Sequence, residues 1–172
     1  MNRRSAMTVA GLALLPLVIS QPAVAQKKPM KEQLVGSWSL VSLRATGTDG
    51  KTIDPYGPNG KGTLTFERNG RFALILVNPD SPKFASNLRD KPTPEEALSA
   101  NKDSFSFFGS YSVDESDKTF VFHVEASSYP NFNGTNQKRI VKNITETELR
   151  FTNLAPPTGG TITELVYRRN VN

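Results

Sequence analysis

The stretch TLTFERNGRFALILV, residues 63–77, has the pattern of two β-strands joined by a tight turn. Leu64 and Phe66 alternate with polar residues, so the first strand has one apolar face. The pair Asn69-Gly70 is typical of a two-residue hairpin turn, because both residue types tolerate positive φ. The apolar residues after Gly70 form the returning strand. This hairpin sets the pattern for the rest of the chain.

Further segments have similar apolar spacing and are bounded by turn residues. With the hairpin they give eight expected strands: 36–45, 63–68, 71–77, 105–113, 119–126, 135–144, 149–152 and 161–169. Eight sequential strands predict an all-β, up-and-down antiparallel barrel, because closure removes exposed edges. The long connection, residues 78–103, is expected to hold a short helix starting at Thr93-Pro94-Glu95-Glu96. A barrel of this size has room for side chains or for one small ligand.

The composition excludes several classes of chemistry. The chain has 172 residues, 37% of them apolar, which suits one domain with a real core. The absence of cysteine excludes disulfides, thiolate metal sites and cysteine nucleophiles. A single histidine excludes a multi-histidine metal centre, and neither a metal nor a cofactor is predicted. The formal net charge of +5 is diffuse rather than gathered into a basic stripe, so no nucleic-acid partner is expected.

The first 25 residues are expected to be a cleavable secretory signal peptide. Arg3-Arg4 gives a positive start, residues 7–19 form an apolar run, and Ala23-Val24-Ala25 offers the small residues that a signal peptidase requires. A retained N-terminal anchor is the alternative. The arginine pair leaves both the general and the twin-arginine export routes open.

Cleavage after Ala25 would leave a tail, residues 26–33, and a single domain, residues 34–172. The apolar run is short for a membrane span, so no stable membrane insertion is expected after cleavage. The sequence thus predicts an exported protein, either periplasmic or secreted.

An ordered set of short motifs resembles the lipocalin-like domain family of bacteria and fungi. The first is Gly36-x-Trp38, the pattern that opens lipocalins. The others follow in order over nearly the whole mature chain: Pro55-Tyr56-Gly57, Asn59-Gly60, Asn69-Gly70-Arg71, Phe108-Gly109-x-Tyr111, His123-Val124-Glu125, Pro130-Asn131, Gly134, Gln137-x-Arg139 and Tyr167-x-Arg169. The family often has tryptophan at the position of Tyr167. The resemblance implies a barrel with an internal pocket, but a fold does not by itself determine a ligand.

The resemblance also implies how the barrel closes. Trp38, next to Gly36, would plug one end, with Arg169 over its indole in a cation–π contact of roughly 0.5 to 2 kcal/mol. Contact of Trp38 with a ligand is the alternative. Closure at this end directs a ligand to the opposite mouth, where Tyr56 and Tyr129 would form a rim.

His123 and Glu125 are the candidates for chemistry. Alternation along the strand places Phe120, Phe122 and Val124 inside and the His–Glu pair outside, in water. The resemblance favours the reverse, because His-x-Glu followed by Pro-Asn recurs in the family as a block. Weighing both arguments, we expect the pair to face the lumen.

The next strand would set Gln137 and Arg139 against this pair in a cross-strand network. Such a cluster has three possible uses: a satisfied core network, a holder for the polar head of an apolar ligand, or a catalytic site. In the last, His123 acts as general base and Tyr111 or Arg139 polarises a carbonyl. The predicted ligand-binding residues are Tyr56, Tyr111, His123, Glu125, Tyr129, Asn131, Gln137 and Arg139.

The sequence therefore predicts a barrel that binds a small, largely apolar molecule in its lumen without turning it over. The first alternative is an isomerase or cyclase, which requires His123 to face the cavity. The second is an envelope interaction or inhibitor protein whose lumen is packed with Phe66, Phe72, Phe108, Phe120 and Phe122. A cavity smaller than a few hundred Å³ would favour that alternative. Residues 78–103 are expected to move as a lid beside the mouth.

Overall fold

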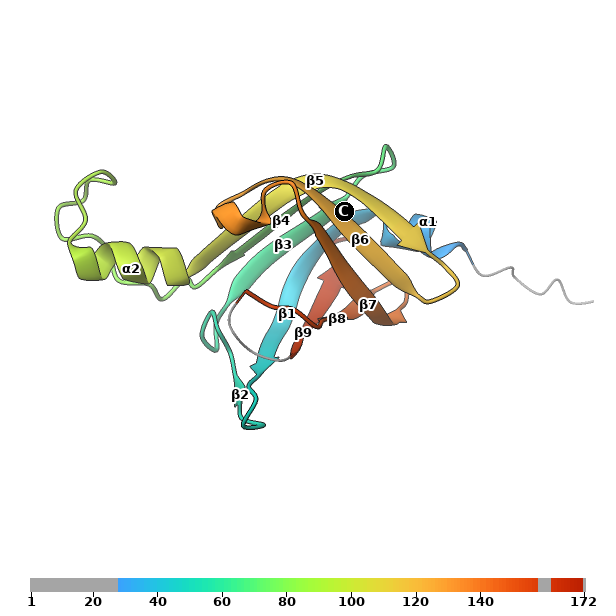
Figure 1. The fold of residues 1–172 in the computed structure, drawn as a ribbon, viewed down its shortest axis with the longest axis horizontal. Helices are drawn as coiled ribbons and strands as arrows, with labels where there is room; N and C mark the ends of the chain where they lie inside the picture. Colours follow the sequence, from blue (N-terminus) through green and yellow to red (C-terminus); the bar gives the residue numbers. More distant parts are fainter. Residues whose placement is uncertain (1–27, 158–161, 172) are drawn as a thin grey trace, which may run out of the picture.

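The computed structural model describes residues 28–157 and 162–171, which form one antiparallel β-barrel (Figure 1). The strands are β1 (Gly36–Thr46), β2 (Thr52–Ile53), β3 (Lys61–Phe66), β4 (Arg71–Val77), β5 (Ser104–Asp114), β6 (Thr119–Ser127), β7 (Asn136–Ile144), β8 (Glu148–Asn153) and β9 (Ile162–Arg169). Each strand from β3 to β8 pairs with the strand that follows it in the sequence. Strand β1 pairs with both β3 and β9, which closes the barrel. The predicted eight-stranded barrel is confirmed, and the two-residue strand β2 is an addition beside β1. The expected signal peptide, residues 1–25, lies outside the described residues.

The hairpin between β3 and β4 forms as predicted, but its turn differs in detail. Phe66 pairs with Phe72, and the backbone N–H of Glu67 donates to the carbonyl of Arg71 at 2.8 Å. Three residues, Arg68, Asn69 and Gly70, therefore lie between the bonded residues Glu67 and Arg71, rather than two. Gly70 adopts φ of +85° and Asn69 does not have positive φ, so only the glycine takes the left-handed conformation. A two-residue type I′ turn would need that conformation at both residues.

Two helices and one 3₁₀ turn flank the barrel: α1 (Met30–Leu34), α2 (Pro94–Lys102) and η1 (Pro130–Phe132). Helix α2 begins as predicted, because the Thr93 hydroxyl accepts from the N–H of Glu96 and the Glu96 carboxylate accepts from the N–H of Thr93. Helix α1 crosses the expected boundary between the tail, residues 26–33, and the domain. Its Met30 and Leu34 are buried, so the end of the expected tail belongs to the folded core.

One end of the barrel is closed by Trp38, which is fully buried. The indole N–H of Trp38 donates to the carbonyl of Leu34 at 2.8 Å, and Arg169 Cζ lies 3.9 Å from the centre of the Trp38 ring. Gly36 has φ of +133°, and a Cβ there would lie 2.6 Å from Arg169 Nη1. Glycine is therefore required for the guanidinium to reach its place over the indole.

Phenylalanine rings fill the barrel above this plug. Alternation along the strands turns one apolar side chain in two inward, and the inward rings contact one another edge to face or tilted. The shortest of these separations, 4.2 Å between ring centres, joins Phe72 and Phe122. The buried rings are Phe66, Phe72, Phe107, Phe120, Phe122 and Phe151. Phe108, which the sequence analysis also placed among the filling residues, is 47% exposed, because it alternates with the inward Phe107.

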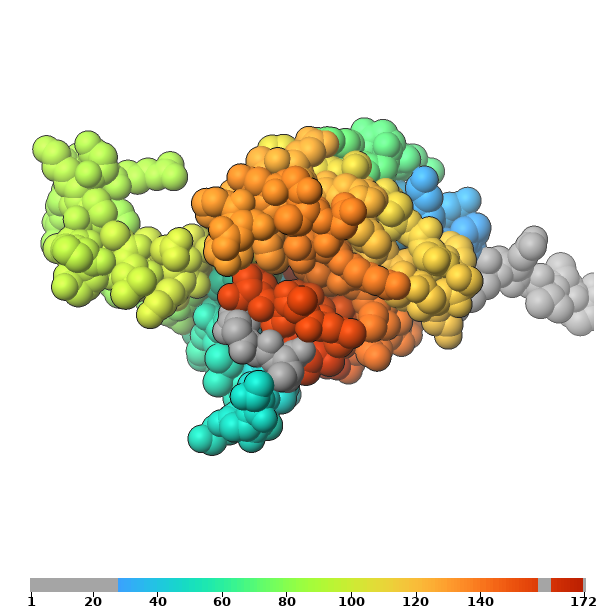
Figure 2. All heavy atoms as spheres, in the orientation of Figure 1, coloured from blue at the N-terminus to red at the C-terminus, as the bar shows by residue number. Residues whose placement is uncertain are grey.

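Residues 78–103, which we call the arm, project from the other end of the barrel (Figures 1 and 2). The base of the arm is tied together by Asp103, whose carboxylate accepts hydrogen bonds from Ser81, Asn78 and Ser99. These bonds, that of Ser81 foremost, lower the pKa of Asp103. Helix α2 within the arm has no buried residue. No helix of the described residues is long and apolar enough to cross a membrane.

Candidate functional site

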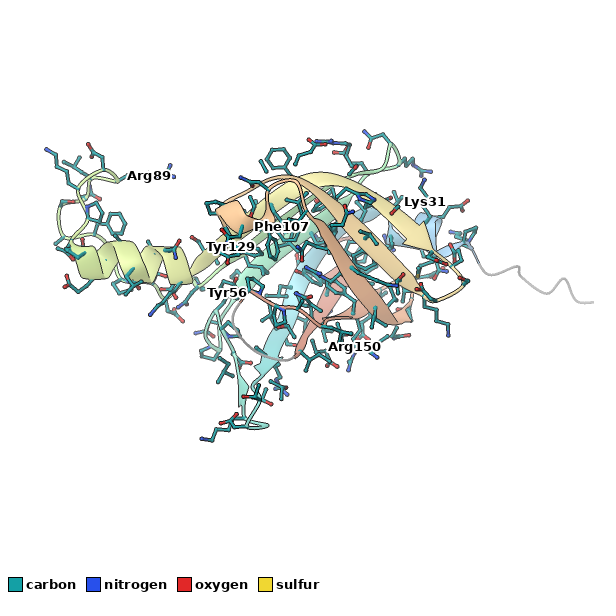
Figure 3. The ribbon with its side chains drawn as sticks, in the orientation of Figure 1. Lys31, Tyr56, Arg89, Phe107, Tyr129 and Arg150 are labelled. Atoms are coloured by element: carbon teal, nitrogen blue, oxygen red, sulfur yellow. The ribbon has the colours of Figure 1, made fainter. Side chains whose placement is uncertain are left out.

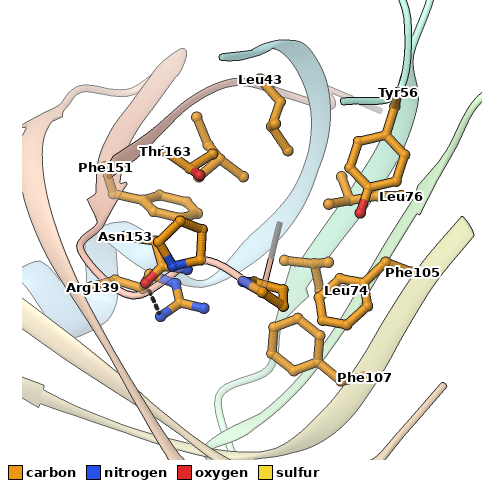
Figure 4. Close-up of a pocket in the computed structure, with 13 residues that line it drawn as sticks. Leu43, Tyr56, Leu74, Leu76, Phe105, Phe107, Arg139, Phe151, Asn153 and Thr163 are labelled. Carbon is orange, nitrogen blue, oxygen red and sulfur yellow. Dashed lines mark hydrogen bonds between the residues drawn. The ribbon is translucent and has the colours of Figure 1, made fainter. Parts of the chain in front are cut away.

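A pocket lies in the barrel at the end opposite Trp38. It is lined by side chains from six strands, from the loop between β2 and β3 and from the segment after β8, and its cavity volume is about 40 Å³ (Figure 4). That volume has room for roughly three water molecules. The lining residues are Leu43, Tyr56, Leu74, Leu76, Phe105, Phe107, Arg139, Phe151, Asn153, Pro156, Pro157, Thr163 and Leu165.

The pocket walls are apolar because inward-facing positions of neighbouring strands coincide there. Leu74 on β4 pairs with Phe107 on β5, and Leu76 pairs with Phe105, so each aliphatic side chain lies beside an aromatic one. Pro156 contributes to the rim, since the chain leaves β8 at this end. The pocket is thus a small apolar cup above the packed phenylalanine rings.

Arg139 brings a positive charge into this cup. Its side chain comes from β7, beside Phe120 of β6, and the residue is only 5% exposed. Nη1 donates to the carbonyl of Lys138 at 2.8 Å and to Asn153 Oδ1 at 3.2 Å, and Cζ lies 5.6 Å from the centre of the Phe122 ring. Burial lowers the pKa of Arg139 to about 10, so the guanidinium still carries its charge at neutral pH.

Two tyrosines add hydroxyl groups near this charge. Tyr56 faces Arg139 across the pocket (Figure 4), and burial raises the pKa of Tyr56 to about 12. Tyr167 is fully buried, and burial raises its pKa as well, with the neighbouring Tyr56 and Arg139 acting on it electrostatically. Among the described residues, the Tyr167 hydroxyl and Thr163 Oγ1 have no hydrogen-bond partner. The pocket region therefore holds polar groups that the fold does not satisfy.

A second depression lies on the other side of Tyr56. It has a volume of about 190 Å³ and is bounded by residues 40–44 of β1 and by the loop that carries Tyr56. Here β1 has parted from β3, because their pairing ends at Ser39 and Thr63. Leu43 and Tyr56 line both spaces, so these two side chains separate the lumenal pocket from a side cleft.

The expectation that His123 and Glu125 face the lumen is wrong. Phe120, Phe122 and Val124 occupy the inner face of β6, as alternation alone indicated. Glu125 lies outside and forms an ion pair with Arg71, Nη2 to Oε2 2.8 Å, with both side chains about half exposed. This pairing lowers the pKa of Glu125.

His123 lies on the same outer face, between side chains of the two neighbouring strands. Its Nε2 is 2.8 Å from Ser112 Oγ, and its Nδ1 is 2.7 Å from Asn136 Oδ1. A hydroxyl, an imidazole and an amide in line would suit nucleophilic chemistry. None of the three lines the lumenal pocket or the side cleft, so a substrate bound in either of these two spaces would not lie against them. They form a cross-strand hydrogen-bond ladder.

The structure supplies a local reason for the His123-Val124-Glu125 block. Phe108 pairs with Ala126 and Gly109 pairs with Val124, so Glu125 is the extra residue of a β-bulge. A Cβ on Gly109 would lie 2.0 Å from the carbonyl oxygen of His123. The glycine is therefore needed for the bulge, and the bulge brings Glu125 to Arg71.

The other predicted site residues are dispersed. Tyr111 is buried near the closed end, where its hydroxyl donates to the carbonyl of Glu67. Tyr129 lies at the same end as Tyr56 (Figure 3) and accepts a hydrogen bond from Asn131, and neither Tyr129 nor Asn131 lines the pocket. Gln137 donates to Thr135. Of the eight residues, only Tyr56 and Arg139 line the lumenal pocket.

Sequence reasoning missed most of the pocket. Asn153 continues the inward alternation of Leu149 and Phe151, and this signal was available one residue beyond the expected strand. Thr163 lies opposite Asn153 on β9. Pro156 reaches the pocket through a loop, for which no periodic signal exists. Within residues 28–157 and 162–171, no three His, Asp or Glu side chains are grouped so that they could hold a metal ion.

Comparison with known proteins agrees with this architecture. A closed antiparallel barrel with a cup at one end defines a class of proteins that can hold a small ligand inside the barrel. A family model described as a lipocalin-like domain matches residues 35–169, and the chain belongs to this lipocalin-like family.

Two solved structures are similar to the chain at low identity. A lipocalin-like protein from Bacteroides uniformis ATCC 8492 is 17% identical, with 80% of this chain and 99% of that chain covered and a TM-score of 0.42. A redesigned β-barrel is 14% identical, with 83% and 96% covered and a TM-score of 0.44. A search of curated proteins finds no match.

Proposed function

We propose that this protein binds a small, largely apolar molecule in the pocket at the open end and releases it unchanged. The observation that carries this proposal is the lining of the pocket, in which mostly apolar side chains surround a few polar groups. Small-molecule sites have this composition, because apolar walls supply affinity and the few polar groups fix orientation.

Binding is favoured over turnover by the groups around the pocket. None of the residues that line the described pocket is Asp, Glu or His. The pKa values of Tyr56, raised to about 12, and Arg139, lowered to about 10, both lie far from neutrality, where general acid–base catalysis works best. The isomerase or cyclase alternative required His123 in the cavity, and that residue lies on the outer face.

We further propose that residues 1–25 direct export, so that the ligand is met in the periplasm or outside the cell. The support is the arginine pair, the apolar run and the small residues before Gln26. The mass of the protein purified from its own source tests this. A chain beginning at Gln26 is expected, and a chain that keeps its first 25 residues would contradict it.

Native and denaturing mass spectrometry of the protein, purified from its source without detergent, tests binding. A discrete added mass that disappears on denaturation is expected. Leu76→Phe should fill the pocket and abolish the added mass, since Leu76 lines it. Ile75→Phe, on the outer face of the same strand, is the matched control and should retain it. No added mass, even after lipid and aromatic extracts are offered, would contradict the proposal.

A second candidate is an interaction or inhibitor protein acting through its loops. The small cavity and the arm favour it, because Leu88 and Leu98 of the arm are about half exposed and α2 buries no residue. Leu98→Ser should then weaken a partner complex isolated by pull-down, with Leu154→Ser, equally exposed but outside the arm, as control. Equal recovery of the partner with both variants would exclude the arm as the interaction surface.

A further inference from the structure

The strongest unexplained feature of the lumen is a buried charge without a counter-ion. Arg139 is 5% exposed, and no carboxylate of the described residues pairs with it. Residues 1–27 and 158–161 contain neither Asp nor Glu, so the rest of the sequence supplies no acidic side chain either. Buried charges in proteins are paired or bound to an ion, because an isolated one is costly to desolvate.

The guanidinium also has donors to spare. Arginine has five N–H groups in a planar fork. In the described structure only Nη1 makes hydrogen bonds, to Lys138 and Asn153, which leaves the N–H groups of Nε and Nη2 without a protein acceptor. The Thr163 hydroxyl, which lines the same pocket, is likewise unsatisfied. Arg139 and Thr163 therefore both have donors that no acceptor of the described structure bonds.

We infer that the ligand is a small apolar carboxylic acid whose carboxylate is bound by Arg139. A planar carboxylate has two oxygens that match two parallel N–H groups of the guanidinium fork, and it can also accept from a hydroxyl. Its single negative charge balances the single cation of the pocket, since no lysine or second arginine lines it. A dianion such as a phosphate monoester would keep an uncompensated charge.

The walls of the pocket determine the chemistry of the rest of the ligand. Beyond Arg139, Asn153 and Thr163, the pocket is bounded by aliphatic, aromatic and proline side chains. The apolar part of the acid would lie against these side chains and extend toward the open end. With a cavity volume of about 40 Å³, the pocket admits a slender chain or one small ring only if the side chains at its rim move apart.

This inference rests on the proposed function, and matched probes separate the two. Octanoate and octan-1-ol have the same chain length and differ in the charged head, as do benzoate and benzyl alcohol. Calorimetric titration of the intact protein at neutral pH is expected to give at least about tenfold tighter binding of the acid of each pair, as hydrogen bonds to charged groups contribute. Equal affinities for acid and alcohol would overturn the inference and leave the proposed function standing. Binding of neither class at millimolar concentration would overturn both.

Arg139→Met removes the charge at nearly constant length and should abolish the preference for the acid. Arg150→Met, on the outer face of β8, is the matched control and should keep it, because Arg150 is a half-exposed residue paired only with Glu148 and Glu164. Arg139→Lys keeps the charge without the planar fork, so it should retain part of the preference and serves if Arg139→Met fails to fold. An undiminished preference in a folded Arg139→Met protein would overturn the inference.

Discussion

The two ends of the barrel each hold a guanidinium group in contact with an aromatic ring, but in only one of the two do all three nitrogens donate hydrogen bonds to the protein. Arg169 at the closed end donates to three backbone carbonyls, those of Glu146, Val35 and Gln33, while stacking on Trp38. Arg139 at the open end donates from Nη1 alone and faces a cavity. The same side-chain type thus bonds to the fold through all three nitrogens in one place and through one nitrogen in the other.

This difference separates a structural residue from a binding residue. A side chain that fixes the fold uses its donors on the protein, because each unmade bond of a buried group costs stability. A side chain kept for a ligand has donors that the protein leaves free. On this criterion Arg169 stabilises the closed end, and Arg139 has donors that can bind an acceptor of a ligand.

The largest effect is expected at the closed end. Arg169→Met leaves the carbonyls of Gln33, Val35 and Glu146 without their donors and removes the cation–π contact, so the free energy of unfolding should fall by about 3 kcal/mol. Urea denaturation measures it. Arg168→Met, next in the chain but exposed, is the control and should change stability by less than about 0.5 kcal/mol. A similar loss in the free energy of unfolding in both variants would contradict a structural role specific to Arg169.

At high pH, the free energy of unfolding should depend on the buried charge of Arg139. Burial lowers the pKa of Arg139 from its usual range to about 10, so above this pH the unfolded chain binds the proton that the folded chain has released. Stability from this group therefore rises with pH in this range, by about 1 kcal/mol per unit. The unfolding free energy of the wild type minus that of Arg139→Met should increase accordingly between about pH 10 and about pH 12, because effects of Tyr56 cancel in the difference. A flat difference in paired urea titrations would contradict it.

The ion pair on the outer face should matter little. Arg71 and Glu125 are 41% and 51% exposed, and solvent screens their attraction. Arg71→Met and Glu125→Gln should each leave the free energy of unfolding nearly unchanged, and ligand affinity should not change. A double-mutant cycle by urea denaturation measures the coupling. A coupling energy as large as the loss in Arg169→Met would show that this exposed pair stabilises the fold as much as the closed end does.

The smallest effect on binding is expected from His123. His123→Ala removes two hydrogen bonds on the outer face and should leave the affinity for any lumenal ligand unchanged, as measured by calorimetric titration. Trp38→Phe, which removes the hydrogen bond from the indole to Leu34 at the closed end, is the structural variant with which His123→Ala is compared. Loss of binding in a folded His123→Ala protein would place the functional site outside the pocket.

The arm offers a separate prediction about motion. Hydrogen exchange in residues 78–103 should be faster than in the strands, since α2 buries no residue and few contacts join it to the barrel. The arm projects away in this structure and lines no part of the pocket, so a role as a lid stays a prediction. Exchange as slow as in the barrel strands would contradict it.

The fold could be predicted because its signals are local. Leu64 and Phe66 alternate with polar residues, and Asn69-Gly70 ends their strand, so neighbouring residues alone define the hairpin. The closed end was implied by the resemblance to the lipocalin-like family, which placed Arg169 over Trp38. Strand alternation placed Phe122 inside, and this proved a better guide to His123 than its presence in a recurring block.

The candidate site could be predicted only in part, because it depends on contacts between distant segments. Arg139 was correctly chosen as a polar residue for the lumen, but its expected partner Glu125 is bonded to Arg71 outside. Glu125 pairs with Arg71 because of the bulge at Gly109, a backbone feature that the pattern of side chains does not reveal. Pro156 enters the pocket from a loop, where no periodicity exists to place it.

The most direct test of the account is the unfolding free energy of Arg139→Met without ligand, measured by urea denaturation beside the wild type. If Arg139 is kept for a ligand, replacing a buried unpaired charge by an apolar side chain should leave stability unchanged or raise it by about 1 kcal/mol. Asn153 would still accept from the N–H of Ala155, so the substitution orphans little. A loss of more than about 2 kcal/mol would show that Arg139 supports the fold as Arg169 does, and would contradict the account.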